Sequence, residues 1–372
     1  MSDGRWDMGE GGAGILGAGV RETANGAETA GRLAGYDTVS TSLALCGDAE
    51  LRRLVDTATP LGTGIGGKSA RLDVSGRPVF VKRVPLTDLE RRPEHIRSTA
   101  NLFGLPMVCQ YGVGGPGFGA WREVAAQTMT TNWVLSGQFQ GFPLMYHWRV
   151  LPDEEPGLPE ELADVDKVVD YWGGSAEVRR RVEALGQSSA SVALFLEYVP
   201  QTLHAWLTAQ VRAGGEALDR ACSLVERELR AGTSFMSSRG LLHFDAHFEN
   251  ILTDGRRLYF ADYGLALSTR FDLSRAGADF FYRHRAYDRC YTASWLVNWL
   301  ITALYPGDWE ERGRLIQAWA EGRQPTGAPP GAAEILSRNA PVAAVMTDFY
   351  RRLQGVSRTT PYPGERLRRL CP

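Results

Sequence analysis

The sequence contains little cysteine, and its cysteines follow no framework spacing. Among 372 residues there are five, an odd number without a CxxC pair: Cys46, Cys109, Cys222, Cys290 and Cys371. A disulfide scaffold and a cysteine-rich zinc site are therefore disfavoured, and a reducing, cytoplasmic environment is expected. No run approaches the roughly 18 apolar residues that a transmembrane helix needs, so we expect no membrane span.

The sequence also lacks an excess of either positive or negative charge. The chain has 41 Lys and Arg against 43 Asp and Glu, a formal net charge of −2. This balance argues against a strongly basic nucleic-acid binder and against a polybasic membrane anchor. The hydrophobic fraction of 44% and the charged fraction of 23% are ordinary for a chain that buries a core. The length favours two domains or one large two-lobed domain.

The first 38 residues differ in composition from the rest. They are rich in Gly and Ala, with GEGGAGILGAGV at positions 9–20, and acidic residues surround this weak apolar patch. A signal peptide would need a basic start and a continuous apolar core. We therefore interpret residues 1–38 either as a disordered tail or as an over-long start, with the real start nearer Val39.

The remaining pattern predicts an α+β fold with two lobes. Two alternating runs flank Ser75-Gly76-Arg77 and indicate a β-hairpin, and the order of later elements changes from mostly strands to mostly helices near Val199-Pro200. We expect a small antiparallel-sheet lobe and a larger helical lobe. The predicted units are helices at 48–59, 88–103 and 121–135, strands at 142–151 and 192–199, an N-terminal lobe at 39–199 with insertions at 84–120 and 152–190, and a helical lobe at 200–372.

A glycine-rich stretch precedes the predicted hairpin. Residues 62–69, GTGIGGKS, match the P-loop pattern GxxxxGK[ST], while Gly62, Gly64 and Gly67 also match GxGxxG. Glycines allow backbone N–H groups to approach a phosphate closely, but a P-loop must open a helix. Because a hairpin follows, we predict a phosphate-covering loop within a hairpin; an ordinary glycine turn is the alternative. Lys82, in VFVKRV, could project from the next strand into a cleft and pair with phosphates, or could be an exposed strand lysine.

The strongest signal is LLHFDAHFENIL at 241–252. It places Asp245 and Asn250 five residues apart between apolar segments, and Asp262 follows 12 residues later in FADYGLA. Phosphoryl transfer assisted by Mg²⁺ needs a carboxylate that orients or deprotonates the acceptor hydroxyl, together with oxygen ligands for the cation. A polar turn between a helix and a strand is the structural alternative.

Taken in order over roughly residues 55–305, these features resemble the protein-kinase-like superfamily, which includes eukaryotic-type protein kinases and aminoglycoside and choline phosphotransferases. The resemblance implies ATP and Mg²⁺ as cofactors. Lys82 would hold the nucleotide phosphates, Asp245 would be the catalytic base, and Asn250 and Asp262 would bind Mg²⁺. The resemblance also implies that Glu197 and Tyr198, in LFLEYVP, lie at a hinge beside the adenine.

A glutamate on a helix should pair with the strand lysine in this family. We choose Glu123, in WREVAAQ, because its helix directly precedes the strand at 142–151. It lies 41 residues after Lys82, a long separation for the family, so Glu90 and Glu94 are rivals and a solvated position for Glu123 is the alternative.

Three departures from the family concern the acceptor. Phe244 replaces the arginine that reads a phosphorylated activation loop, and no A-P-E stretch follows Gly264. His247 replaces a lysine of protein kinases and is typical of small-molecule phosphotransferases; it could contact the γ-phosphate or the substrate, or be a satisfied loop histidine. Asp288 is a candidate anchor for the catalytic loop. The run Arg179–Arg181 is interpreted as a solvated helix face rather than an acceptor site.

The sequence therefore predicts a phosphotransferase that moves the γ-phosphate of ATP to a hydroxyl. A Ser or Thr hydroxyl of a protein or peptide is the first choice of acceptor. A small-molecule phosphotransferase, acting on an antibiotic or a metabolite, is the second, and a non-catalytic pseudokinase scaffold is the third. No nucleic-acid or membrane partner is expected.

Overall fold

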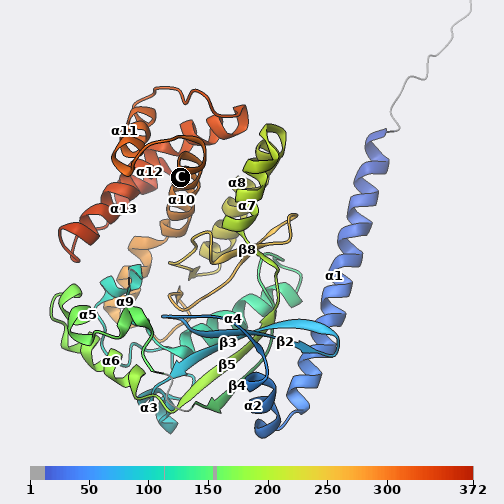
Figure 1. The fold of residues 1–372 in the computed structure, drawn as a ribbon, viewed down its shortest axis with the longest axis vertical. Helices are drawn as coiled ribbons and strands as arrows, with labels where there is room; N and C mark the ends of the chain where they lie inside the picture. The colour runs from blue at the N-terminus through green and yellow to red at the C-terminus, as the bar shows by residue number, and fades with distance from the viewer. Residues whose placement is uncertain (1–12, 113, 154–156, 372) are drawn as a thin grey trace, which may run out of the picture.

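A five-stranded antiparallel sheet and a set of helices make up this mixed α+β protein, shown here as a computed structural model (Figure 1). The structure describes residues 13–112, 114–153 and 157–371. The sheet has the strand order β1-β2-β3-β5-β4, and each neighbouring pair is antiparallel. Its strands are β1 (Thr59–Gly64), β2 (Gly67–Val74), β3 (Arg77–Leu86), β4 (Met145–Pro152) and β5 (Ala190–Glu197). We call residues 46–199 the sheet part and residues 200–371 the helical part.

The predicted hairpin is confirmed as β2 and β3. Ser75 and Gly76 both have positive φ, 53° and 75°, which suits the tight two-residue turn whose twist matches that of paired strands. Asp73 accepts a hydrogen bond from the backbone N–H of Gly76. Strand β3 continues as a central strand and buries Val79 and Val81.

Helices cover the sheet, and the segments between strands are long. Helix α2 (Asp48–Asp56) begins with two acidic residues, which suit the positive end of a helix dipole. Helix α4 (Ala120–Leu135) is where the sequence predicts a helix at 121–135. The helix predicted at 88–103 is mostly wrong: α3 (Asp88–Arg91) ends directly before Arg92, which precedes Pro93 and has extended backbone. The remaining sheet-part elements are η1 (Pro93–His95), η2 (Met107–Tyr111), η3 (Glu160–Leu162), α5 (Val165–Tyr171) and α6 (Ala176–Gly186).

The two predicted insertions pack against each other. Leu105, Cys109 and Phe118 from the first insertion share an apolar cluster with Val182 and Leu185 from the second. Each insertion therefore contributes apolar side chains to one shared cluster. The result is a compact unit beside one end of the sheet, where Figure 1 shows α5 and α6.

The helical part follows β5 and contains two small sheets. The sheet β6-β8-β9 joins Gln201–Thr202, Ile251–Thr253 and Leu258–Phe260, and β7 (Leu241–Leu242) pairs with β10 (Leu267–Ser268). Helix α10 packs along α12 and α8, and its residues Leu296, Val297, Leu300 and Ile301 are buried. The helices are α7 (Leu203–Ala213), α8 (Gly215–Ser238), α9 (Arg275–His284), α10 (Tyr287–Leu304), α11 (Trp309–Ala320), α12 (Pro330–Gly355) and α13 (Gly364–Leu370).

The disorder predicted for residues 1–38 is wrong for residues 13–38. Helix α1 (Ala13–Leu45) covers them and also crosses the boundary predicted at Val39; residues 1–12 lie outside the described residues. The Gly and Ala content of this segment suggests disorder because it does not indicate that the helix contacts distant segments of the chain. Gly35 is buried within this segment, and Val39 and Leu43, directly after it, are fully buried in the main core.

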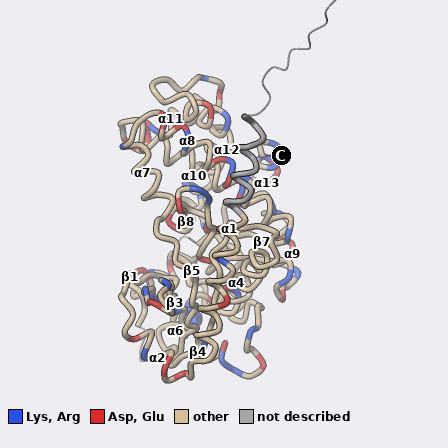
Figure 2. Tube along the Cα trace, turned by 90° about the vertical axis from the view of Figure 1, so that its right-hand side faces the viewer, with Lys and Arg blue, Asp and Glu red and all other residues tan. Residues whose placement is uncertain are grey.

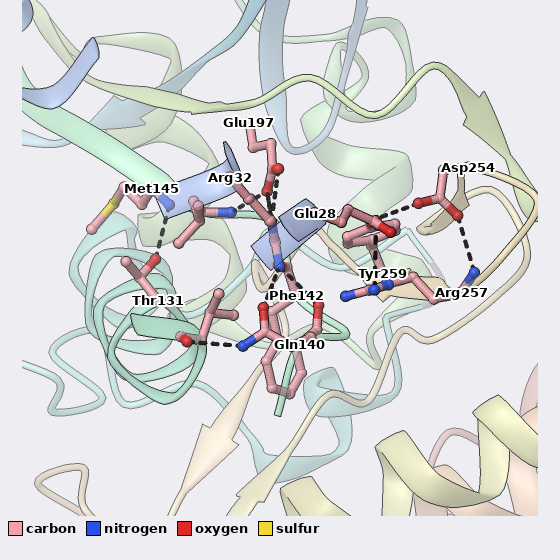
Figure 3. A network of polar contacts seen from close by, with 12 residues as sticks. Glu28, Arg32, Thr131, Gln140, Phe142, Met145, Glu197, Asp254, Arg257 and Tyr259 are labelled. Atoms are coloured by element: carbon pink, nitrogen blue, oxygen red, sulfur yellow. Dashed lines mark hydrogen bonds and ion pairs between the residues drawn. The ribbon is translucent and has the colours of Figure 1, made fainter. Parts of the chain in front are cut away.

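A polar network holds α1 against both parts of the molecule (Figure 3). The Arg32 guanidinium donates through Nε to Glu197 at 2.8 Å, through Nη1 to the Gln140 carbonyl at 3.0 Å, and through Nη2 to the carbonyl of Phe142. One turn earlier, Glu28 pairs with Arg257 of the helical part at 3.5 Å. Helix α1 therefore spans the junction between the two parts.

Acidic and basic residues are scattered along the trace of the molecule, and neither sign dominates in the view of Figure 2. This distribution agrees with the near-zero net charge. Among the described helices, none is both long enough and apolar enough to cross a membrane.

The network around Arg32 generates a stability prediction. Arg32→Ala leaves the Glu197 carboxylate, whose side chain is 17% exposed, without its cation. Breaking a largely buried pair costs on the order of 3 kcal/mol, so we expect the free energy of unfolding to fall by about that amount. Urea unfolding followed by circular dichroism measures it. Arg220→Ala, at a helix-surface pair with Glu216, is the matched control and should change the value by less than about 0.5 kcal/mol. Equal losses in both variants would contradict the role of Arg32.

Candidate active site

Three charged side chains from separate elements meet at one point. Lys82 projects from β3, and its Nζ lies 2.7 Å from Glu123 Oε1 on α4 and 2.7 Å from Asp262 Oδ1, two residues after β9. The lysine and the glutamate are nearly inaccessible, with side chains 8% and 2% exposed, whereas Asp262 remains 36% exposed. The three predicted residues are thus brought together, and Glu123 is the glutamate that meets the strand lysine.

The charges of this cluster stabilise one another. Burial alone would lower the pKa of Lys82, but the carboxylates of Asp262 and Glu123 outweigh it and raise that pKa above its usual value. Burial alone would raise the pKa of Asp262, and the Lys82 ammonium with the N–H of Gly264 brings it below the usual value. Lys82 is therefore a permanent cation and Asp262 a carboxylate at neutral pH.

The rivals of Glu123 are placed elsewhere. Glu90 is buried and accepts a hydrogen bond from Arg181 Nη1 at 2.7 Å, and Glu94 is exposed. This pairing also corrects the interpretation of Arg179–Arg181 as a solvated helix face. Arg179 is half-buried and Arg180 exposed, and both bind surface carboxylates, but the side chain of Arg181 is only 4% exposed.

Asp245 and Asn250 face each other across the loop between β7 and β8. The Asn250 amide nitrogen donates to Asp245 Oδ2 at 2.9 Å and to the backbone carbonyl of the same aspartate at 3.1 Å. The Asp245 side chain is 30% exposed, so solvent or a ligand can reach it. Partial burial, helped by the nearby Asp262 carboxylate, raises the pKa of Asp245 to about 7.

His243 ties this loop to the strand end that precedes Asp262. Its Nε2 lies 2.9 Å from the carbonyl of Ala261, and its Nδ1 lies 3.3 Å from the backbone N–H of Asp245. An N–H can only donate and a carbonyl can only accept, so the neutral ring carries its proton on Nε2. Burial lowers the pKa of His243 to about 4 and keeps the ring neutral. The sequence analysis assigns His243 no role, although its position two residues before Asp245 in LLHFDAHFENIL could have indicated one.

Asp288, on α10, anchors the same loop as the sequence suggests. Its carboxylate accepts hydrogen bonds from the backbone N–H of His243 at 2.6 Å and of Phe244 at 2.9 Å. Phe244 has φ of 64°, a left-handed conformation that a bulky aromatic residue rarely adopts. Its ring is buried and stacks on Tyr287 with 4.6 Å between centroids. Packing and the Asp288 carboxylate together hold the unfavourable backbone that orients Asp245.

His247 lies beside Asp245. Its Nε2 is 3.7 Å from Asp245 Oδ1, and its Nδ1 is 3.2 Å from the backbone N–H of Glu249. The N–H of Glu249 makes Nδ1 the acceptor, so Nε2 carries the proton and faces the carboxylate side. Burial lowers the pKa of His247, which favours the neutral ring. The residue is thus a hydrogen-bonded loop histidine that lies next to the Asp245 carboxylate.

The glycine loop forms the hairpin of β1 and β2, with a turn at Ile65-Gly66 and no helix at Gly67–Ser69. Gly67 is required by packing: its φ is 111°, and a Cβ there would lie 2.0 Å from the carbonyl oxygen of Arg83. A Cβ on Gly66 would lie 3.2 Å from Lys82 Nζ. The glycine nearest the charged cluster is therefore Gly66, which sequence reasoning missed, and not one of the three predicted, Gly62, Gly64 and Gly67.

A cavity of about 460 Å³, which we call the hinge cavity, lies between the glycine loop and the helical part. Lys82, Tyr198, Asn250 and Asp262 border it. Glu197 also borders it, but its carboxylate is bound by Arg32 and by the backbone N–H of Leu144 at 3.0 Å. The side chain of Glu197 therefore secures α1, and only its backbone remains as a contact for a ligand. The Tyr198 ring lies under Arg71, whose guanidinium carbon is 4.9 Å from the ring centroid.

A second cavity, of about 260 Å³, adjoins the first, and we call it the inner cavity. Gly66, Glu123 and Asp262 border both cavities. Asp245 borders the inner cavity, and Lys82 and Asn250 border the hinge cavity. The charged cluster thus stands between two adjacent spaces, with the predicted base on the inner side.

The oxygen atoms that could act as ligands of a cation are those of the Asp262 carboxylate and the Asn250 amide. The Asn250 nitrogen is used as a donor to Asp245, which leaves the oxygen as the atom for a cation. Among the described residues there is no group of three or more His, Cys, Asp or Glu that could hold a metal ion. Two protein oxygens suit Mg²⁺, which keeps several waters and is commonly shared with substrate phosphates.

A scan against protein-family models finds no match to this chain, and a search of curated proteins finds no significant match either.

The loop anchor generates a second stability prediction. Asp288→Ala removes the acceptor of two buried N–H groups, and each unsatisfied donor costs about 1–3 kcal/mol. We expect the free energy of unfolding to fall by roughly 2–6 kcal/mol, measured by chemical denaturation. Asp279→Ala, at an exposed position of the neighbouring helix α9, is the control and should have little effect. A loss at Asp288 no larger than that of the control would show that the loop does not depend on this carboxylate.

Proposed function

We propose that this protein is a protein-kinase-like phosphotransferase that moves the γ-phosphate of ATP to a hydroxyl, with Mg²⁺ as the cofactor, in the cytoplasm. The observation that carries the proposal is the meeting of Lys82, Glu123 and Asp262 under Gly66 of the hairpin loop. A buried lysine beside a glycine-rich hairpin, with a carboxylate held at a strand end, suits a nucleotide triphosphate and its cation.

The order of the two cavities supports the same reaction. The hinge cavity has room for a nucleotide, since small-molecule sites commonly measure about 300–1,000 Å³. Asp245 lies beyond the charged cluster on the inner side, where an acceptor hydroxyl would have to be placed. Donor and acceptor would therefore approach Asp262 from opposite sides, as an in-line transfer requires.

In the proposed reaction the acceptor oxygen bonds to the γ-phosphorus while the bond from that phosphorus to the bridging oxygen of ADP breaks. The Asp245 carboxylate orients the hydroxyl and takes up its proton, which then passes to solvent. Lys82 holds the phosphates, and Asp262 with Asn250 would hold Mg²⁺. When bound, the cation neutralises charge on the phosphate oxygens. Asp288 and His243 keep the Asp245 loop in position.

A catalytically inactive scaffold is less well supported. Such a protein would not need Asp245 to remain reachable, nor Asn250 to be oriented by it.

The two lysines of the glycine-loop region are expected to contribute unequally to nucleotide binding. Lys82→Ala should weaken the binding of Mg²⁺-ATP roughly tenfold to a hundredfold, because a charge-assisted contact is worth about 1.5–3 kcal/mol. Lys68 lies on β2 opposite Thr63 and Arg83, so Lys68→Ala should change the affinity by less than about threefold. Isothermal titration calorimetry with a non-hydrolysable ATP analogue measures both. A larger loss at Lys68 would support a P-loop and defeat the proposal.

The two aspartates should separate binding from transfer. Asp245→Asn should lower the transfer rate by about 10²–10⁴-fold with nearly unchanged nucleotide affinity, because the residue acts on the acceptor. Asp262→Asn should weaken nucleotide binding only when Mg²⁺ is present; asparagine tolerates the left-handed φ of 62° at this position. Binding titrations with and without Mg²⁺ and a phosphate-transfer assay measure these effects. Equal losses of affinity in both variants would mean that the roles are assigned wrongly.

A further inference from the structure

Two cysteines that are far apart in the sequence meet in the helical part. Cys290 lies on α10, where its side chain is fully buried, and Cys371 directly follows α13. Cys371 packs against the apolar cluster that contains Cys290, and the two side chains share a hydrogen bond. Both cysteines are free thiols, so the contact is a pair of thiols that could be oxidised to a disulfide.

The two thiols differ in their access to solvent. A cavity of about 290 Å³, which we call the thiol cavity, is bordered by Cys371 together with residues of α8, α10 and α12. Cys371 is half-buried, whereas Cys290 does not border the cavity and is inaccessible. A small reagent can therefore approach Cys371 first and meets Cys290 only through it. Redox-sensing cysteines commonly combine an accessible thiol with a second thiol beside it.

The surroundings of the pair also divide the roles of the two thiols. The hydrogen bond from Cys290, helped by the positive charges of Arg289 and Arg230 at the thiol cavity, outweighs burial and brings the pKa of Cys371 below its usual value. The same hydrogen bond, together with burial, raises the pKa of Cys290. Because the thiolate is the nucleophile in disulfide chemistry, Cys371 is the attacking residue and Cys290 the one that resolves the product.

We propose that Cys371 and Cys290 form a reversible disulfide, which joins the end of α13 to α10, when the protein meets a small-molecule disulfide such as oxidised glutathione. The Cys371 thiolate attacks one sulfur of the reagent, so that a mixed disulfide forms and one thiolate leaves. The Cys290 sulfur then attacks the Cys371 sulfur, and the departing second thiolate takes the proton of Cys290. Two protein thiols are thereby oxidised to one disulfide, and the reagent is reduced to two thiols.

The place of the pair connects it to the candidate active site, although the inference does not depend on the proposed phosphotransfer. Asp288, whose carboxylate binds two backbone N–H groups of the Asp245 loop, lies on α10 two residues before Cys290. A disulfide at Cys290 thus restrains the helix that anchors this loop. In the reducing environment that the cysteine content predicts, such a pair is open at rest and closes only transiently.

The direct test treats the reduced, folded full chain with oxidised glutathione at neutral pH, blocks the remaining thiols and maps an unreduced digest by mass spectrometry. A peptide that links Cys290 to Cys371 should be the main product and should disappear on treatment with dithiothreitol. Cys46, the other half-buried cysteine, is the internal control, because burial and the nearby Glu50 raise its pKa. It should react roughly tenfold more slowly than Cys371. No linked peptide, or a Cys46 that reacts as fast, would overturn the inference.

Single substitutions test the order of the two steps. Cys290→Ser removes the resolving thiol, so a mixed disulfide with glutathione should accumulate at Cys371, and Cys290→Ala repeats the test if a serine in the apolar cluster folds poorly. Cys371→Ser should leave Cys290 unmodified, because that thiol is inaccessible. Cys46→Ser is the matched control and should form the link as the unaltered chain does. The order of steps is wrong if Cys290 is modified in Cys371→Ser, or if a folded Cys290 variant carries no mixed disulfide.

Discussion

The ion cluster of Lys82 with Glu123 and Asp262 is the constraint on which the rest of the site depends. A buried ammonium costs several kcal/mol to desolvate, and only paired carboxylates with good geometry offset that cost. The two carboxylates come from α4 and from the loop after β9, so the lysine can be buried only if both elements approach β3. The pairing therefore sets the position of the sheet relative to the Asp245 loop and creates two cavities that share its atoms.

The same principle recurs around this centre. Asp288 is buried because it accepts from two backbone N–H groups, and His243 is buried because both of its ring nitrogens have partners. Arg32 and Glu197 form a third such unit at the junction of the two parts. Each polar group links segments far apart in the chain, so these contacts restrain the loop around Asp245. Enzymes that catalyse phosphoryl transfer act largely by holding groups in prearranged positions of this kind.

The two insertions build part of the wall around the candidate site. Glu90 and Arg181 lie 91 residues apart in the sequence, yet they form a buried pair that joins the two insertions above the inner cavity. Arg181 also borders the inner cavity, so this pair holds one wall of the cavity against the first insertion. This part of the site thus arises from segments that carry no recognisable motif.

The sequence alone determined the hairpin, the loop around Asp245 and the chain order of the charged residues, because each depends on local spacing and turn chemistry. It also made Glu123 a candidate, because its predicted helix directly precedes the strand at 142–151, and the resemblance to the kinase-like superfamily made Asp288 a candidate. Other features were decided by tertiary structure. Helix α1 forms because Val39, Leu43 and Arg32 find partners that its Gly- and Ala-rich composition does not reveal. Local sequence patterns do not show whether Lys82 pairs with Glu90 or with Glu123, or whether Arg181 is solvated or buried. Both outcomes depend on which charged residues from distant parts of the chain form a pair that excludes water.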